Sequence, residues 1–135
     1  MARTYTTTLA QKLGIKEGMA IFAINAPDRY LEMLAPLPDG VRLADKPAKE
    51  SAPFVHLFAP SVAELDRKLP LARKALAREG MLWVSWYKKA AKIPTDLTED
   101  IVRARALATD LVDVKICAVS DIWSGLKLVI RRHLR

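Results

Sequence analysis

Short, nearly continuous apolar runs recur along this chain, separated by segments with helical spacing. The clearest runs are Met19–Ile24, Pro53–Phe58 and Met81–Trp86. Runs of this length and character are typical of strands that are covered on both faces of a sheet. Between the second and third runs, apolar residues recur every three or four positions from Val62 to Leu76, which predicts a helix. Strands separated by helices predict right-handed crossovers and a parallel, doubly wound sheet.

Glycine, proline and capping residues set the expected element boundaries. Helices are expected over 9–13, 27–34, 62–79 and 96–109, and the remaining strands over 41–43, 112–119 and 126–131. Gly14 and Gly80 are expected to end the first and third helices. Pro70 should kink or split the third helix because it lacks a backbone donor. Asp96 and Glu99 have the spacing of a capping box, so Asp96 is expected to begin the last helix.

The last two expected strands are joined by a turn of six residues, 120–125. So short a connection cannot make a parallel crossover, so these strands must be antiparallel. A terminal antiparallel hairpin on a parallel sheet resembles the Rossmann-like fold of S-adenosylmethionine-dependent methyltransferases. The local similarity is clearest where 76–80 lead into 81–84, like a helix, glycine turn and strand of those enzymes. The resemblance implies a three-layer α/β domain with a mostly parallel six-stranded sheet of order 2-1-3-4-6-5.

A second resemblance covers nearly the whole chain, from about Leu9 to Arg132. It is carried by the segments 12–16, 25–27 with Tyr30, 82–86 with 88–89, 95–99, 114–119 and 123–126. On these segments the chain is similar to a small bacterial family of uncharacterised proteins, known as a domain of unknown function. The resemblance supports the fold. It brings no established activity with it.

Length and composition predict one soluble domain that spans residues 1–135. Apolar residues make up 51% of the sequence and charged residues 27%, which is typical of globular proteins. No apolar stretch reaches the twenty residues that a membrane-spanning helix needs, and the N-terminus does not read as a secretory signal. Cys117 is the sole cysteine, which excludes an internal disulfide and a cysteine-based metal cluster. These features favour the cytoplasm.

The net charge of +7 raises the question of an anionic partner. The basic residues fall in short groups over 67–78, 88–92 and 131–135, none of which is a run of five like charges. Ordinary solvation is therefore the favoured interpretation, and nucleic-acid binding through the basic surface ranks last. A protein partner or a second copy of the chain is the other expected partner. Residues 121–124 are expected in a self-association contact, because the hairpin leaves a sheet edge that must be covered.

Ligands of open parallel sheets bind at the carboxyl ends of the strands, where the strand order reverses. In the expected order this point lies between Asn25–Pro27 and Ser61. Nucleotide-binding folds carry glycines here, whereas this chain has none; Pro27 lacks a backbone donor and Asp28 is negatively charged. A pyrophosphate is therefore disfavoured and no cofactor is expected. S-adenosylmethionine carries no phosphate, so it stays as the alternative.

The candidate ligand crevice combines residues near the carboxyl ends of the expected strands with those of the last turn. Its members are Asn25, Pro27, Tyr30, Ser61, Trp86, Lys88, Lys89, Thr95, Asp96, Asp121 and Trp123. Two lysines at a strand end are suited to an anionic group. In the alternative interpretation, Asp96 caps its own helix and the lysines are solvated or pair with Asp121. Strand alternation places Trp83 and Trp86 on opposite faces, which favours core packing.

No catalytic residue is predicted. His56 lies in the middle of an apolar strand and is expected to be a packed histidine. With two histidines and one cysteine the chain has few ligands for a transition metal. Three hypotheses follow: a non-catalytic binding or interaction module that lacks the glycine-rich cofactor loop, a divergent methyltransferase-like enzyme, and a basic-surface nucleic-acid binder.

Overall fold

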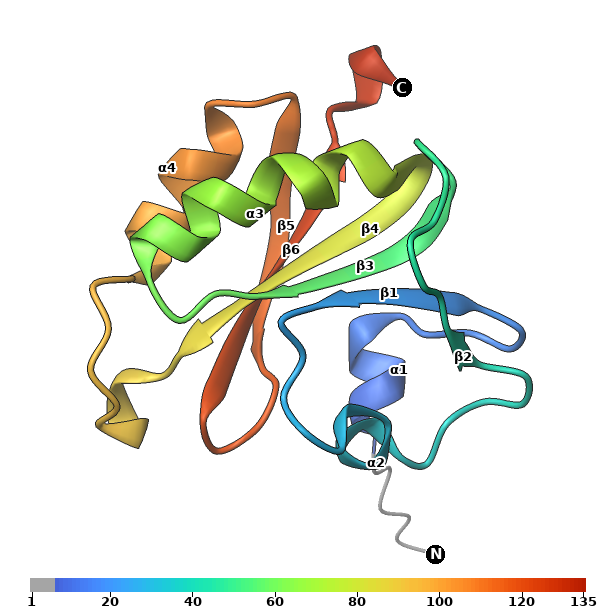
Figure 1. Cartoon of the computed structure of the whole chain (residues 1–135), viewed down its shortest axis with the longest axis horizontal. Coiled ribbons are helices and arrows are strands. Elements are labelled where there is room, and N and C mark those ends of the chain that lie inside the picture. Colours follow the sequence, from blue (N-terminus) through green and yellow to red (C-terminus); the bar gives the residue numbers. More distant parts are fainter. Residues whose placement is uncertain (1–6) are drawn as a thin grey trace, which may run out of the picture.

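A computed structural model describes residues 7–135 and contains one six-stranded sheet (Figure 1). The strands are β1 (Ala20–Ile24), β2 (Arg42–Leu43), β3 (Ala52–Phe58), β4 (Leu76–Tyr87), β5 (Leu111–Ala118) and β6 (Trp123–Ile130). Their order is β2-β1-β3-β4-β6-β5, as the sequence predicts. Strands β1 to β4 are parallel, and β6 is antiparallel to both β4 and β5. The predicted α/β fold with a terminal antiparallel hairpin is therefore confirmed.

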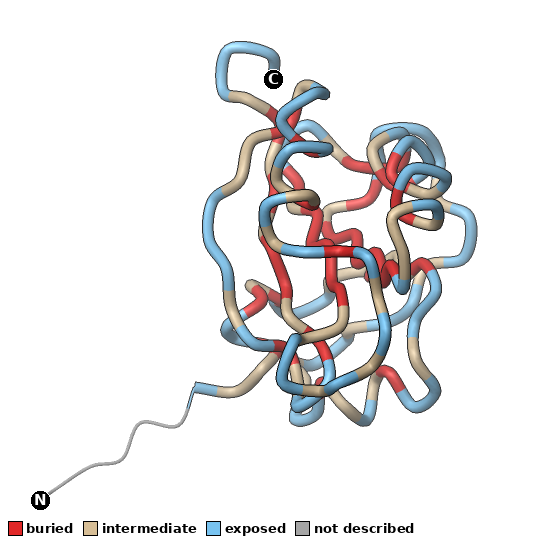
Figure 2. The backbone as a smooth tube through the Cα atoms, turned by 90° about the vertical axis from the view of Figure 1, so that its left-hand side faces the viewer, coloured by how far each residue is buried: buried red, intermediate tan, exposed pale blue. Residues whose placement is uncertain are grey.

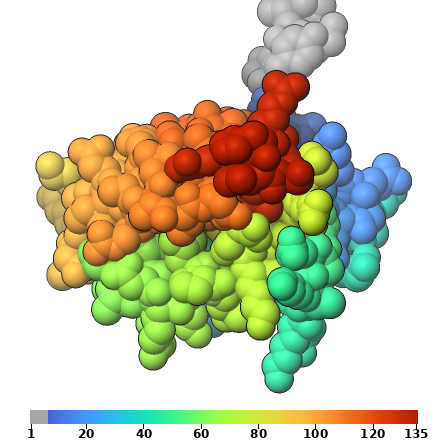
Figure 3. Space-filling view, turned by 90° about the horizontal axis from the view of Figure 1, so that it is seen from above, coloured from blue at the N-terminus to red at the C-terminus, as the bar shows by residue number. Residues whose placement is uncertain are grey.

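Helices lie on both faces of the sheet. On one face lie α3 (Val62–Ala75) and α4 (Glu99–Leu107), which sit side by side when the molecule is viewed from above (Figure 3). On the other lie two helices of five residues, α1 (Leu9–Leu13) and α2 (Tyr30–Leu34) (Figure 1). Two 3₁₀ turns, Lys89–Ala91 and Arg132–Leu134, complete the described elements. No helix among residues 7–135 is both long and apolar enough to cross a membrane.

The core divides into two clusters, one on each face of the sheet. Buried backbone concentrates in the strands, and the connecting segments are exposed (Figure 2). Alternation along β4 sends Trp83 into the cluster under α1 and α2, and Trp86 into the cluster under α3 and α4. The Trp83 indole N–H donates to the Leu13 carbonyl oxygen over 2.9 Å and so ties α1 to the sheet. The two tryptophans are core residues on opposite faces, as alternation predicts.

The third helix is shorter than predicted and β4 is longer. Helix α3 ends at Ala75 and runs through Pro70 without interruption, and Leu76 already pairs with Ala52 of β3. Gly80 is therefore inside β4 and does not end a helix, so the predicted helix and glycine turn over 76–80 are wrong, whereas the predicted strand over 81–86 is confirmed. A Cβ on Gly80 would lie 2.9 Å from the Ala52 carbonyl oxygen, so this glycine lets β4 lie close to β3. Strand pairing outweighs the helical spacing that extends to Leu76.

The starts of two other helices also differ from prediction. Helix α2 begins at Tyr30, because Arg29 before it has a left-handed backbone with a φ of 60°. Pro27 therefore lies in the loop and not in a first helical turn. Helix α4 begins at Glu99, and the Thr98 hydroxyl accepts from the Ile101 N–H over 3.2 Å as its N-cap. The predicted capping role of Asp96 in its own helix is wrong.

Candidate functional site

Asn25 joins the ends of β1 and β3 at the point where the strand order reverses. Its side-chain amide donates to the Phe58 carbonyl oxygen over 3.2 Å and to Glu64 Oε1 over 3.0 Å. The backbone of Asn25 is left-handed, with a φ of 59°, a conformation that asparagine tolerates better than most residues. The hydrogen bond from Asn25 lowers the pKa of the Glu64 carboxyl, and Arg67 lowers it further. The chain's own side chains thus bridge the predicted crevice.

The N-terminus of α3, which faces this crevice, is also occupied by the chain itself. The Ser61 hydroxyl accepts from the Glu64 N–H, and Asp96 Oδ1 accepts from the Val62 N–H over 2.8 Å. The Thr95 hydroxyl donates to the Pro60 carbonyl oxygen over 2.9 Å. Asp96 therefore caps a helix 34 residues earlier in the chain, which no local sequence pattern indicates. These bonds use backbone N–H groups that a bound anion would otherwise need.

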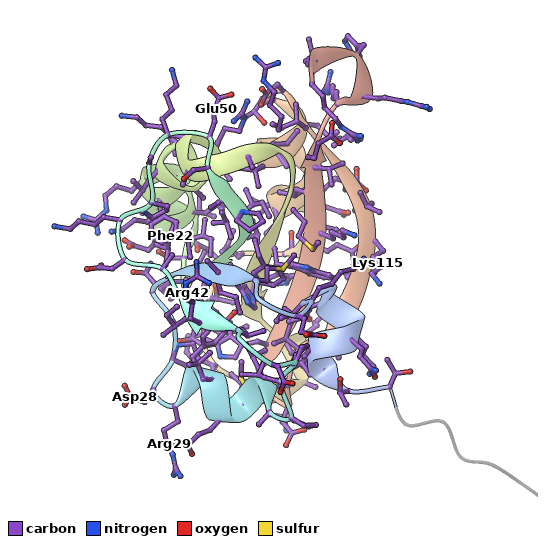
Figure 4. The ribbon with its side chains drawn as sticks, turned by 90° about the vertical axis from the view of Figure 1, so that its right-hand side faces the viewer. Phe22, Asp28, Arg29, Arg42, Glu50 and Lys115 are labelled. Atoms are coloured by element: carbon purple, nitrogen blue, oxygen red, sulfur yellow. The ribbon has the colours of Figure 1, made fainter. Side chains whose placement is uncertain are left out.

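The loop after β1 contains no glycine and is followed by a short helix. Pro27 offers no N–H, and Asp28 and Arg29 point away from the sheet into solvent (Figure 4). Arg29 pairs with Glu32 of α2 over 2.6 Å. Helix α2 is only five residues long and has no side-chain cap. This loop therefore lacks the glycine backbone and the long helix start that hold a dinucleotide in Rossmann folds.

A groove of about 650 Å³ lies one strand further along, at the carboxyl end of β4. Lys88, Lys89 and Lys92 contribute its positive charge, and Glu99 at its margin is paired with Arg103 over 2.7 Å. Apolar and hydroxyl groups make up most of the remaining lining: Trp86, Tyr87, Ile93, Pro94, Thr95, Leu97, Thr98, Ile116 and Ser124. The groove therefore combines a cationic side with apolar walls.

Within the part of the chain that the structure describes, the lysines of the groove form no ion pair. Every ion pair between residues 7–135 uses an arginine, so no described lysine lies within 4.0 Å of a carboxylate oxygen. The expected alternative pairing of Lys88 or Lys89 with Asp121 is therefore absent from the described part of the chain. The backbone N–H of Lys88 instead donates to the Ile122 carbonyl oxygen over 2.8 Å, which fixes the start of the loop beside the last turn.

The predicted crevice residues do not form one site; Pro27 lies in the loop after β1, and the others are spread over several places. Trp86, Lys88, Lys89 and Thr95 line the groove, and Thr95 also belongs to the hydrogen-bonded set of Asn25, Ser61 and Asp96. Tyr30 and Trp123 lie in the core under α1 and α2, where Trp123 stacks on Tyr87 with ring centroids 4.4 Å apart. Asp121 is exposed on the last turn. The structure thus divides the residues that sequence reasoning placed in one crevice.

A buried polar chain crosses the core from α2 to β4. Tyr30 Oη lies 2.7 Å from His56 Nδ1, and His56 Nε2 lies 2.8 Å from Ser85 Oγ. His56 and Ser85 are fully buried. Burial lowers the pKa of His56 to about 3 and raises the pKa of Tyr30, so both are neutral near pH 7. The predicted packed histidine is confirmed, whereas its two partners were not predicted because the three residues are distant in sequence.

A further groove of about 700 Å³ lies between α3 and α4. Its arginines are paired: Arg73 donates to both Asp110 oxygens at 2.7 and 2.8 Å, and Arg105 pairs with Asp66 over 2.7 Å. The Arg73 bond lowers the pKa of Asp110. The two guanidinium groups are thus engaged by carboxylates. Within residues 7–135 no cluster of three metal-ligating side chains occurs.

Comparison with solved structures shows which fold this is. The chain is similar to a crystal structure of a SAM-dependent methyltransferase from Aquifex aeolicus, with a TM-score of 0.69. The match covers 90% of this chain and 87% of that chain at 12% sequence identity. No family model matches the chain, and no curated protein matches it. The methyltransferase-like topology is therefore shown, and at this identity the likeness concerns the fold. The resemblance to a small bacterial family stays a prediction.

Proposed function

We propose that this protein is a non-catalytic binding module on a methyltransferase-like scaffold, with the groove beside β4 as its ligand site. The observation that carries the proposal is the pairing of Asn25 with Phe58 and Glu64 across the fold's usual cofactor crevice. A cofactor there would have to displace these bonds and the bonds that Ser61 and Asp96 make at the start of α3. The groove beside β4, by contrast, carries Lys88, Lys89 and Lys92, and none of them forms an ion pair with a described carboxylate.

The chemistry of the groove selects an anionic ligand with an apolar part. Lys88 and Lys89 present ammonium groups suited to a carboxylate, sulfonate or phosphate. Trp86, Ile93 and Ile116 supply apolar wall area. The lining contains no histidine, cysteine or aspartate, and the carboxylate of Glu99 is held by Arg103. These residue types favour binding over acid–base or nucleophilic chemistry.

A divergent methyltransferase-like enzyme is the second candidate, because the fold is that of such enzymes. This candidate needs S-adenosylmethionine at the carboxyl ends of β1 and β3. It therefore predicts that Asn25 and Glu64 separate on binding. The two candidates differ in whether S-adenosylmethionine binds, and in whether an anion in the groove binds independently of it.

The aromatic sulfonate 8-anilinonaphthalene-1-sulfonate is a direct probe of the groove. We expect saturable fluorescence enhancement at one site, and the double variant Lys88→Gln/Lys89→Gln should weaken binding about five-fold through loss of two charges. The matched variant Lys16→Gln/Lys68→Gln removes the same charge elsewhere on the surface and should change the affinity by less than about two-fold. Fluorescence titration measures both. Equal weakening in the two variants would contradict a ligand site in the groove.

A further inference from the structure

Strand β5 forms one edge of the sheet and is poorly covered there. It follows β6 at the end of the strand order, so no strand among residues 7–135 lies beside its outer backbone groups. Val114 is 51% exposed and Ile116 is 44% exposed, whereas alternate residues of β6 are buried. An exposed edge strand with apolar side chains is a ready template for another strand.

Two lysines lie directly opposite each other at this edge. Lys115 of β5 pairs in register with Lys127 of β6, so both side chains are on the same face of the sheet. Like charges in directly opposed positions destabilise a sheet. The face is the one that carries α1, and Lys115 lies at its outer surface in Figure 4. No carboxylate among residues 7–135 pairs with either lysine.

Edge protection explains only part of this arrangement. Proteins often place a lysine or a bulge on an exposed edge to prevent pairing, and β5 has both, since its register shifts between Asp113 and Lys115. Lys127, however, lies on the inner strand β6, where a charge does not protect the edge. It is also part-buried, and burial together with Lys115 lowers the pKa of its ammonium group. A second positive charge at this position is unfavourable until an anion is present.

We propose that the β5 edge binds an extended acidic strand of a partner protein. Pairing along Lys115–Ala118 places alternate partner side chains on the two faces. Acidic side chains then lie beside Lys115 and within reach of Lys127, and apolar side chains cover Ile116. The partner segment is therefore one in which acidic and apolar residues alternate. The β5 edge is a different surface from the groove of the proposed function, and the two share only Ile116. The test of one proposal can therefore fail while the other proposal stands.

A second copy of this chain is a poorer occupant. Each copy carries a net charge of +7, and pairing of two β5 edges would bring two Lys115–Lys127 pairs together. Like charges at an interface oppose association. An acidic segment instead neutralises the two lysines, so charge complementarity selects a different protein.

The probe is a synthetic eight-residue peptide of alternating glutamate and valine with blocked ends. We expect it to bind, with slower hydrogen exchange at the β5 amides that point away from β6, as measured by NMR. Lys115→Glu should weaken binding at least about ten-fold, whereas the matched variant Lys49→Glu, with the same net charge, should weaken it less than about two-fold. A second peptide, in which lysine replaces each glutamate, should bind the Lys115→Glu variant more tightly than it binds the original protein.

Folding of the variant is checked independently. Lys115→Glu replaces a like-charge pair by an opposite-charge pair with Lys127, so its melting temperature should rise by about 1–3 °C. Loss of peptide binding in a more stable protein cannot then be attributed to misfolding. An N-methylated peptide that lacks alternate backbone donors should not bind. Equal weakening by Lys49→Glu, no change in β5 amide exchange, or a dimer in light scattering that protects the β5 amides would overturn the proposal.

Discussion

Lowering the pH from 7 to 4.5 is expected to reduce the free energy of unfolding by about 2–3 kcal/mol through His56 alone. Burial lowers the pKa of folded His56 to about 3, and the ring bonds to Tyr30 and Ser85 at both nitrogens. In the unfolded chain the same ring titrates near its ordinary pKa of about 6.5. Between these two values the unfolded state holds more protons, so stability falls as the pH decreases through this window.

Urea unfolding monitored at several pH values measures this effect. His56→Gln keeps an amide donor and acceptor in the core, and its unfolding free energy should change by less than about 0.5 kcal/mol over the same pH range. His133→Gln serves as the matched control and should retain the full pH dependence, since His133 is an exposed residue. The carboxylates with lowered pKa, Asp110 and Glu64, lose their contributions mainly below about pH 4. Equal pH dependence in the original protein and His56→Gln would refute the role given to His56.

Replacing Asn25 by alanine is expected to cost about 2–3 kcal/mol of unfolding free energy. About half of this cost comes from holding alanine in the left-handed conformation at a φ of 59°. The rest comes from the lost amide bond to the Phe58 carbonyl oxygen. Asn25→Gly removes the same bonds without the backbone strain, so it should cost only about 1 kcal/mol.

Chemical denaturation of the three proteins separates a structural Asn25 from a ligand-binding one. Replacing a residue that serves a ligand often stabilises the protein, because binding sites are commonly built at a cost in folding stability. If the Asn25→Ala variant were as stable as the original protein or more stable, the bonds of Asn25 to Phe58 and Glu64 would not contribute to folding stability. The binding-module proposal would then lose its main support.

The fold was largely predictable from the sequence, because it depends on short apolar runs and on the length of the connections between them. The apolar runs predicted three of the strands, and the short turn expected over 120–125 required an antiparallel hairpin. The hairpin is confirmed, but the predicted start of its second strand at 126 is wrong, because β6 begins at Trp123 and pairs with β5 from Ser124 on. Element boundaries failed where a tertiary contact decided them. Leu76 continues the helical spacing of α3, yet it pairs with Ala52 in the sheet. Likewise Asp96 matched a local capping box, but the loop folds back and its carboxylate caps α3.

The candidate site was predictable only in part. Lys88 and Lys89 follow an apolar strand directly, so their place at a strand end could be inferred. The separation of Trp123 from Trp86 depends on which face of the sheet each side chain takes. Asn25 was expected at the crevice, but its bonds to Phe58 and Glu64 cross more than 30 residues of sequence. That Lys115 lies opposite Lys127 could not be predicted, because it depends on the register of the hairpin, and the bulge shifts that register by one residue.

Isothermal titration calorimetry with S-adenosylmethionine, repeated with its demethylated product, tests the central claim most directly. Asn25 bonds to Phe58 and Glu64, and Asp96 bonds to the Val62 N–H, where the cofactor would have to bind, so we predict no heat of binding for either compound up to about 1 mM. Saturable heat at one site per chain, with a Kd below about 100 µM, would contradict the claim and favour the methyltransferase-like enzyme.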